Sequence, residues 1–332
     1  MDTLPPPRRQ GAADHGPRHP GTAAAQPTTP EAELFEQPIG PATTGTPAAQ
    51  PTTPEALSTE PLTIGVVRPL REPVLPHPVL LRTPEISADG IRCGDYRVAA
   101  ASLTGLDHLS DGVPRQDAYD FMPTRCGRLV VAVADGLGSR ERSQIGARLF
   151  TEQVTRLAAE EIGTGDWTAV DYLIRGAEQT QAIAGAVYRQ RPDDVLFVAA
   201  VAVFDTHGAS ISRVGDVTAF ARIDDDEFVE LFPFNPEPGT PDHIVTATLP
   251  GPSRPEVTDL PYPYDRIALA TDGLAKDLRT SPGVYHWLAD RWTTPLTARA
   301  MTHSLSYRRQ TSHDDRTAVV IWRTGHPTPP LV

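Results

Sequence analysis

Between about Ile91 and Thr324, apolar residues follow patterns that are typical of strands and amphipathic helices. Short apolar runs bounded by turn residues predict strands at 96–103, 118–121, 128–134, 195–205, 209–215, 217–223, 228–232, 266–271 and 317–322. Longer segments with apolar residues three or four apart predict helices at 144–162, 167–189, 284–291 and 296–307. Strands at hairpin spacing with inserted helices favour an α+β fold over a doubly wound parallel sheet.

The first 60 residues lack this pattern. They are rich in Ala, Thr, Pro and Gln, and about half of the 35 prolines lie in the first quarter of the chain. This composition buries too little apolar surface to offset backbone ordering at about 1–2 kcal/mol per residue, so we predict disorder for 1–60. Prolines interrupt the apolar residues of 61–90, which predicts an extended arm, packed on the domain or free of it. The domain itself should span 91–325, and 326–332 should be a tail.

The nonamer AAQPTTPEA occurs twice in the first segment, at 24–32 and 48–56. Two copies are too few for a solenoid, and duplication by slippage explains them. Alternatively, their Thr-Thr-Pro steps are phosphorylation or docking sites, because an exposed phosphate adds charge without disturbing a core.

Charge and hydropathy exclude several classes of partner. The formal net charge is -12 and basic residues form no run, so we expect no nucleic-acid partner. No stretch approaches about 20 apolar residues and the start has no signal-like apolar region, so we expect no membrane insertion and a cytoplasmic protein. Cys93 and Cys126 give neither metal spacing nor a disulfide framework.

Four aspartates stand where predicted strands begin or end: Asp117, Asp135, Asp272 and Asp315. Two of them follow apolar runs in the same way, in VVAVADGLGS and IALATDGLAKD. Each alone could be an exposed turn residue. If the sheets bring all four together, however, the carboxylates cannot all stay ionised without a cation. Oxygen ligands without a histidine or cysteine cluster favour Mg²⁺ or Mn²⁺ over zinc.

Five short motifs in order make the chain resemble the metal-dependent protein serine/threonine phosphatases of the 2C family, in a bacterial form. They are QDA (116–118), ADGLGS (134–139), VGD (214–216), TDGL (271–274) and DDRT (314–317). The resemblance covers residues 95–323. It implies two antiparallel sheets packed as a sandwich, flanked by helices, with a binuclear metal site at one end.

Residue by residue, the resemblance implies a ligand set for two Mn²⁺ or Mg²⁺ ions. Asp135 should bridge both ions and the Gly136 carbonyl should be a further ligand. Asp272 and Asp315 should hold one ion, and Asp117 should act on the other, directly or through water. Gln116 stands where many members have Glu, so one outer anion is missing.

The activity that the resemblance implies is hydrolysis of phosphoserine and phosphothreonine on proteins. The two ions lower the pKa of a bridging water, and the hydroxide attacks phosphorus in line without a covalent intermediate. The expected partners are phosphorylated proteins, the substrates of a bacterial Ser/Thr kinase, and the enzyme is expected to be a monomer.

The sequence departs from the family at the phosphate-binding arginine, whose place is taken by Gly112. Arg115 could bind phosphate through bidentate hydrogen bonds, or it could be an exposed loop residue. His108 could bind phosphate or act as general acid, or it too could lie exposed in a loop. Leu137 occupies the place where animal members have a histidine.

A third metal ion, where members bind one, uses the aspartate of the VGD turn, here Asp216. The second ligand's place is taken by Lys276, and Asp277 follows it. The lysine could block that ion, replace it with a fixed charge, or simply lie on the surface. The usual Gly-Thr-Thr before the long central strand is replaced by 192–194, which leaves the substrate loop undefined.

Two further interpretations compete with an active phosphatase. A phosphatase-like domain that binds phosphoproteins as a sensor or adaptor is consistent with Gln116 and the missing arginine. A hydrolase with a serine nucleophile would need a G-x-S-x-G elbow, which the sequence lacks.

Overall fold

The computed structural model describes residues 60–69, 74, 83–160, 167–223, 227–233 and 247–324. All of them belong to one unit of the chain, Ala56–Val332, and the fold below is that of this unit. The predicted disorder of 1–60, apart from Glu60, and the predicted tail at 326–332 lie outside the described residues.

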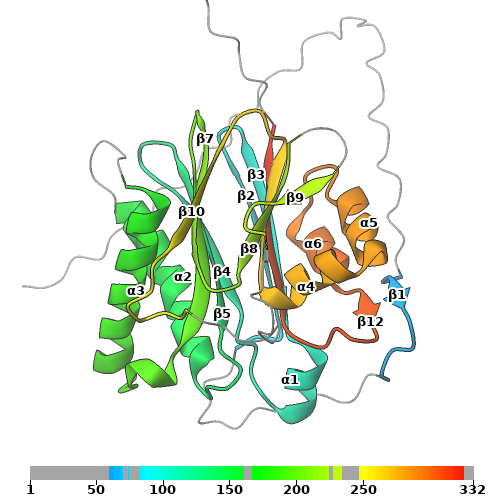
Figure 1. Cartoon of the computed structure of the whole chain (residues 1–332), viewed down its shortest axis with the longest axis horizontal. Coiled ribbons are helices and arrows are strands. Elements are labelled where there is room, and N and C mark those ends of the chain that lie inside the picture. Colours follow the sequence, from blue (N-terminus) through cyan, green and yellow to red (C-terminus); the bar gives the residue numbers. More distant parts are fainter. Residues whose placement is uncertain are drawn as a thin grey trace, which may run out of the picture. The chain divides into compact units, whose positions relative to one another are not determined.

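Two sheets form the centre of this unit (Figure 1). The strands of the first sheet are β4 (Ala118–Pro123), β5 (Leu129–Gly136), β6 (Phe197–Phe204), β7 (Gly208–Val214) and β10 (Glu256–Pro261). The strands of the second sheet are β2 (Ile86–Cys93), β3 (Tyr96–Leu103), β8 (Thr218–Arg222), β9 (Phe228–Glu230), β11 (Arg266–Ala270) and β13 (Arg316–Arg323). Their orders are β10-β7-β6-β5-β4 and β2-β3-β13-β11-β8-β9, and every pairing is antiparallel.

The central strands are buried on both faces. In β5, Val131 and Val133 pack into the core between the sheets, whereas Val130 and Ala132 pack on the opposite face. Strands covered on both faces have continuous apolar sequences. This explains the uninterrupted apolar run before Asp135.

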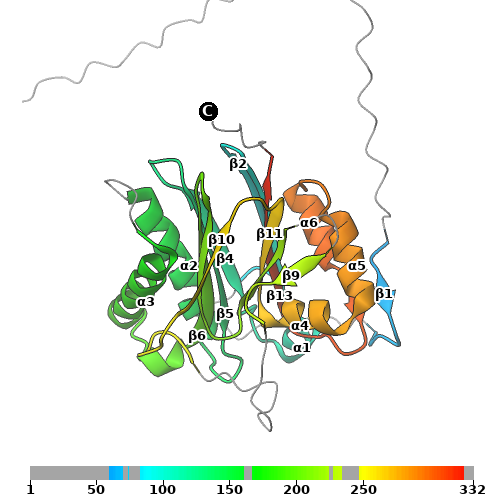
Figure 2. The same ribbon diagram turned by 45° about the horizontal axis from the view of Figure 1, so that its top comes forward.

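Helices cover the outer faces of both sheets (Figure 2). The first sheet packs against α2 (Ser143–Glu160) and α3 (Ala169–Ala186). The second packs against α4 (Asp272–Thr280), α5 (Pro282–Arg291) and α6 (Ala298–Leu305). The predicted α+β sandwich of two antiparallel sheets flanked by helices is confirmed. No described helix is both long and apolar enough to span a membrane.

Part of the predicted arm lies against the sandwich. Its strand β1 (Thr63–Ile64) pairs in parallel with β12 (Arg308–Arg309). Arg68 forms an ion pair with Asp107 of the short helix α1 (Leu106–Asp111), at 2.7 Å.

Four elements of the sandwich were not predicted: β2, α1, β10 and α4. The first of these, β2, begins at Ile86, within the segment assigned to the arm, and is an edge strand with exposed Asp89 and Gly90. Its sequence lacks a continuous apolar run because both faces are only partly covered: Ile91 and Cys93 pack against the core between the sheets, and Ala88 packs on the opposite face. Helix α4 begins at Asp272, and an Asp-Gly pair there looks like a turn in sequence.

Candidate metal centre and active site

Four carboxylates line one cavity of ≈ 440 Å³ at one end of the sandwich: Asp135, Asp216, Asp272 and Asp314. Asp135 is near the end of β5 in the first sheet, and Asp272 begins α4 directly after β11 of the second. Asp216 lies in the turn from β7 to β8, which crosses between the sheets, and Asp314 precedes β13. The strand ends of both sheets therefore meet around this cavity.

Two glycines let the segments around this cavity approach closely. A Cβ atom on Gly273 would lie 2.2 Å from the carbonyl oxygen of Asp315. A Cβ atom on Gly105 would lie 2.3 Å from the carbonyl oxygen of His313. Because neither distance permits a side chain, glycine at both positions allows the loop with Asp314 to sit between the starts of α1 and α4.

The two neighbouring aspartates Asp314 and Asp315 have different surroundings. The carboxylate of Asp315 is 3 % exposed and accepts hydrogen bonds from the backbone N–H groups of Gly105 and Gln116, both at 2.7 Å. It is also 2.9 Å from Nδ1 of His108. The cavity is lined by Asp314 instead of Asp315, the residue assigned to the metal from sequence. Adjacent carboxylates in the DDRT motif cannot be distinguished without knowing the side-chain directions.

Oxygen and nitrogen atoms that could bind a metal ion also lie close together at the edge of the cavity. One oxygen each of Asp314 and Asp315 and a ring nitrogen of His108 lie within 4.8 Å of one another.

Asp117 is buried beneath the carboxylate cluster, at 3 % exposure. Its Oδ2 atom accepts hydrogen bonds from the hydroxyl groups of Thr271 and Thr317, both at 2.7 Å. These hydroxyl groups belong to the TDGL and DDRT motifs, so they tie the start of β4 to two segments of the second sheet. Asp117 does not line the cavity, but it is close enough for its charge to raise the pKa of Asp135.

The carboxylates repel one another in a cavity where Asp135, Asp216 and Asp272 are half-buried and Asp314 is exposed. Burial, followed by the charges of Asp117 and Asp272, raises the pKa of Asp135 well above its usual range. Burial and the charges of Asp314 and Asp216 raise the pKa of Asp272 to about 7. Burial also raises the pKa of Asp216 and of Asp314.

Within the described part of the chain, none of the four cavity carboxylates forms an ion pair. Carboxylates gathered in one cavity are stabilised in their charged form by a cation, and their oxygen donors are those that Mg²⁺ and Mn²⁺ prefer. The donor set therefore fits divalent metal ions.

His108 is brought to the cavity by α1 and lines it. Burial lowers the pKa of His108, but the hydrogen bond and charge of Asp315, together with Asp314 and Asp117, outweigh this and raise it to about 9. The imidazole is therefore protonated at neutral pH, with its Nδ1–H donating to Asp315. His108 is not the exposed loop residue of the alternative interpretation.

Arg115 faces away from the cavity. Its side chain is 7 % exposed, its Nη1 donates to the carbonyl oxygen of Ser102 at 2.9 Å, and its Nε donates to that of Asp117 at 3.2 Å. It is therefore neither an exposed loop arginine nor directed at the carboxylates. Gln116, Gly136 and Leu137 do line the cavity.

Lys276 and Asp277, the residues considered in connection with a third metal ion, differ in burial and in contacts. Lys276 is exposed on α4 and does not line the cavity. Asp277 is buried, accepts hydrogen bonds from Tyr307 and Ser312, and pairs with Arg309. Asp277 thus holds α4 to the segment before β13, away from the candidate metal site.

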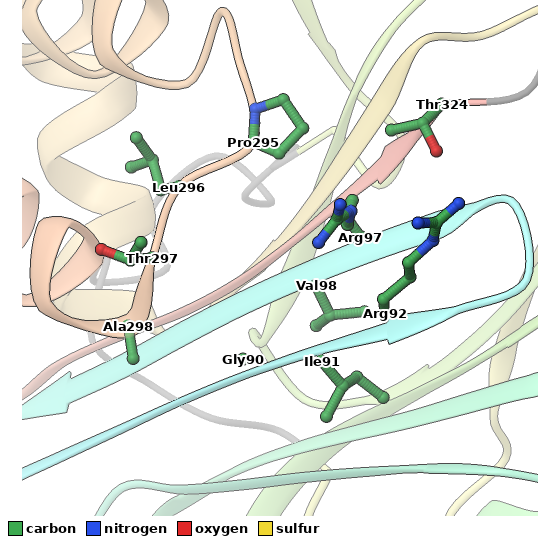
Figure 3. Close-up of a pocket in the computed structure, with 10 residues that line it drawn as sticks. All are labelled: Gly90, Ile91, Arg92, Arg97, Val98, Pro295, Leu296, Thr297, Ala298 and Thr324. Atoms are coloured by element: carbon green, nitrogen blue, oxygen red, sulfur yellow. The ribbon is translucent and has the colours of Figure 1, made fainter. Parts of the chain in front are cut away.

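A larger cavity, of ≈ 720 Å³, contains no carboxylate (Figure 3). Arg92 and Arg97 face it from paired positions of β2 and β3, opposite the loop before α6. In the second sheet, Arg97 pairs with Trp322 of β13. Trp322 lies six residues after Arg316, with which β13 begins next to the candidate metal site. This cavity therefore lies toward the other end of the second sheet.

Comparisons with known proteins agree with this geometry. The family model for protein phosphatase 2C matches residues 104–307. No curated protein sequence matches the chain. Among solved structures, serine/threonine phosphatase Stp1 from Staphylococcus aureus is 16 % identical, with a TM-score of 0.54 over 72 % of this chain and 98 % of that one.

Two further phosphatase structures share the fold. A bacterial serine phosphatase is 15 % identical, with a TM-score of 0.53 over 69 % of this chain and 98 % of that one. The catalytic domain of the phosphatase PstP, in complex with two manganese ions, is 20 % identical, with a TM-score of 0.50 over 68 % of this chain and 97 % of that one. The family match spans more than half of the chain, which therefore belongs to the protein phosphatase 2C family of metal-dependent serine/threonine phosphatases, a family of hydrolases.

Proposed function

We propose that this chain hydrolyses phosphoserine and phosphothreonine in proteins, using two Mn²⁺ or Mg²⁺ ions held by the cavity carboxylates. The observation that carries the proposal is the set of four carboxylates, brought together by segments of both sheets, that line one cavity and have no ion-pairing partner among the described residues. A structure related in fold, PstP, contains two manganese ions.

The proposed ligands are the carboxylates of Asp135, Asp272 and Asp314 and the carbonyl oxygen of Gly136, with Asp216 available for a further ion. Asp117 supports this set from beneath, because its threonine hydrogen bonds fix the carboxylate. When bound, the ions supply an activated water and neutralise charge on the phosphoryl group. The rest of the chemistry falls to the side chains around them.

His108 is the proposed general acid. It lines the cavity, and its hydrogen bond to Asp315 fixes the ring through Nδ1. A protonated Nε2 would then donate to the serine or threonine oxygen as it leaves phosphorus. Asp315 acts through His108, as the residue that orients the ring.

The test is release of phosphate from phosphoserine and phosphothreonine peptides. Turnover should require Mn²⁺ or Mg²⁺, stop with EDTA, and return when excess metal is restored. In Asp135→Asn it should fall by about a hundredfold or more, since loss of one electrostatic group at the reacting centre costs about that much. Turnover that persists in EDTA would overturn the proposal.

A second candidate function is phosphoprotein binding without turnover. Gln116 lines the cavity in place of Glu, and the guanidinium of Arg115 donates to backbone carbonyls. The two functions differ in one assay: a sensor would bind the phosphopeptides at saturating Mn²⁺ and release no phosphate.

A further inference from the structure

A second cavity, of ≈ 410 Å³, adjoins the carboxylate cavity, and three arginines line it. The two cavities share Ser139 as a lining residue. Arg140 and Arg142 come from the loop that follows β5, and Arg189 comes from the segment after α3. We call this group, Arg140, Arg142 and Arg189, the arginine subsite.

The residues that line this cavity carry more positive than negative charge. Its two lining carboxylates are Glu141 and Asp194. Asp194 is already occupied, because Arg191 donates to it through Nη2 at 3.0 Å and through Nε at 3.2 Å. Throughout the described ranges, none of the three arginines of the subsite forms an ion pair or a side-chain hydrogen bond. The three arginines thus share this cavity with Glu141 and with an Asp194 that Arg191 already binds and whose pKa the charge of Arg142 also lowers, in a protein whose net charge is -12.

Hydrogen bonds to backbone carbonyl oxygens hold the loop that carries Arg140 and Arg142. The carbonyl oxygen of Arg140 accepts from the hydroxyl of Ser143 at 3.1 Å and from Nε2 of Gln116 at 3.5 Å. The carbonyl oxygen of Arg142 accepts from the N–H of Ile145 at 3.0 Å. Because Gln116 also lines the carboxylate cavity, the two cavities share a wall. The backbone at Arg140 and Arg142 is therefore held relative to the proposed reaction centre.

We infer that the arginine subsite binds carboxylate side chains flanking the phosphorylated residue and so makes the enzyme selective for acidic phosphopeptides. This inference rests on the proposed function. A peptide extends by at most about 3.3–3.6 Å per residue, so residues within about three positions of the phosphoresidue reach the adjoining cavity. Guanidinium groups bind carboxylates by paired hydrogen bonds. A peptide carboxylate placed in the carboxylate cavity would instead be repelled by the aspartates that line it.

The experiment compares phosphoserine peptides of one length that differ only in having Glu or Gln at the flanking positions, on either side of the phosphoserine. Their kcat/KM values are measured with Mn²⁺. We expect the Glu peptide to be preferred by about three- to tenfold, the effect of one or two partly exposed charge pairs. The double variant Arg142→Gln/Arg189→Gln should lose this preference, and Arg142→Lys should retain part of it.

The matched control is Arg92→Gln/Arg97→Gln, which removes the same charge from the distant cavity of Figure 3. This control should keep the wild-type preference for Glu peptides. Equal kcat/KM values for both peptides in the wild type, or an unchanged preference in Arg142→Gln/Arg189→Gln, would overturn the inference.

A separate readout distinguishes this inference from the proposed function. Hydrolysis of the Gln peptide tests the proposed function, and the Glu-to-Gln ratio tests the subsite. If neither peptide is hydrolysed, fluorescence anisotropy of the same labelled peptides measures the ratio as binding affinity. A binding ratio of one would then overturn the subsite, and a Glu preference that Arg142→Gln/Arg189→Gln abolishes would support it.

Discussion

The Nδ1 atom of His108 lies 2.9 Å from Oδ1 of Asp315, and this contact joins the helix α1 to the loop that carries Asp314. The same carboxylate accepts hydrogen bonds from two backbone N–H groups, which fix its orientation independently of the histidine. A rigid carboxylate that orients a protonated imidazole is an arrangement suited to general acid catalysis.

The role of His108 predicts a dependence on the leaving group. His108→Gln should lower kcat on a phosphoserine peptide by about a hundredfold, within the range that general acids contribute. The same variant should affect p-nitrophenyl phosphate much less, because nitrophenolate leaves without a proton. His286→Gln, at an exposed histidine of α5, is the control and should match the wild type. Equal losses on both substrates would contradict general acid catalysis.

Substitutions of Asp314 and of Asp315 should lower the affinity for Mn²⁺ to different extents. Asp314→Asn removes a carboxylate from the cavity and should weaken Mn²⁺ binding by more than about a hundredfold. Asp315→Asn changes a residue that contacts protein groups, so it should weaken Mn²⁺ binding by only about tenfold, the low end for a residue outside the ligand set, while lowering kcat. Calorimetric titration of both variants measures the two affinities, and a larger loss in Asp315→Asn would restore the ligand assignment made from sequence.

Much of the fold could be predicted from sequence, because doubly buried strands such as β5 have continuous apolar sequences. Edge elements such as β2 could not, since partial exposure of the strand leaves a mixed pattern of apolar and polar residues. The cluster of Asp135 and Asp272 could be predicted from strand ends. The choice between Asp314 and Asp315, and the inward turn of Arg115 toward Ser102, depend on side-chain direction, which spacing does not encode.

The carboxylate cluster predicts that the metal-free protein becomes less stable as pH rises. The pKa of Asp272 is about 7 in the folded protein against an ordinary 3.8, so between these values the folded state holds more protons than the unfolded state. The stability is therefore greatest at the acidic end of this window and is lost as pH rises toward 7.

The measurement is thermal melting in EDTA at several pH values. Between about pH 7.5 and about pH 5.5 the Tm should rise by about 3 °C or more, and Asp272→Asn should flatten this slope. Added Mn²⁺ should raise Tm more at the higher pH, where the carboxylates are ionised. A Tm in EDTA that falls on acidification through this range would contradict the account.

Arg115 should matter for stability and little for substrate affinity. Its guanidinium donates to two backbone carbonyls in a buried position, so Arg115→Met should cost about 2–3 kcal/mol in the free energy of unfolding. Urea denaturation measures this loss, and KM for phosphopeptides at low temperature should change by less than about twofold. A stable variant with a strongly raised KM would instead identify Arg115 as a phosphate-binding residue.

The central claim is that Asp135 and its neighbouring carboxylates form a site for two divalent ions. Its most direct test is calorimetric titration of the metal-free protein with Mn²⁺, in the wild type and in Asp135→Asn. We expect two equivalents to bind the wild type, and Asp135→Asn to lose high-affinity binding of both. Wild-type protein that binds no Mn²⁺, or two equivalents bound equally tightly by Asp135→Asn, would contradict the account.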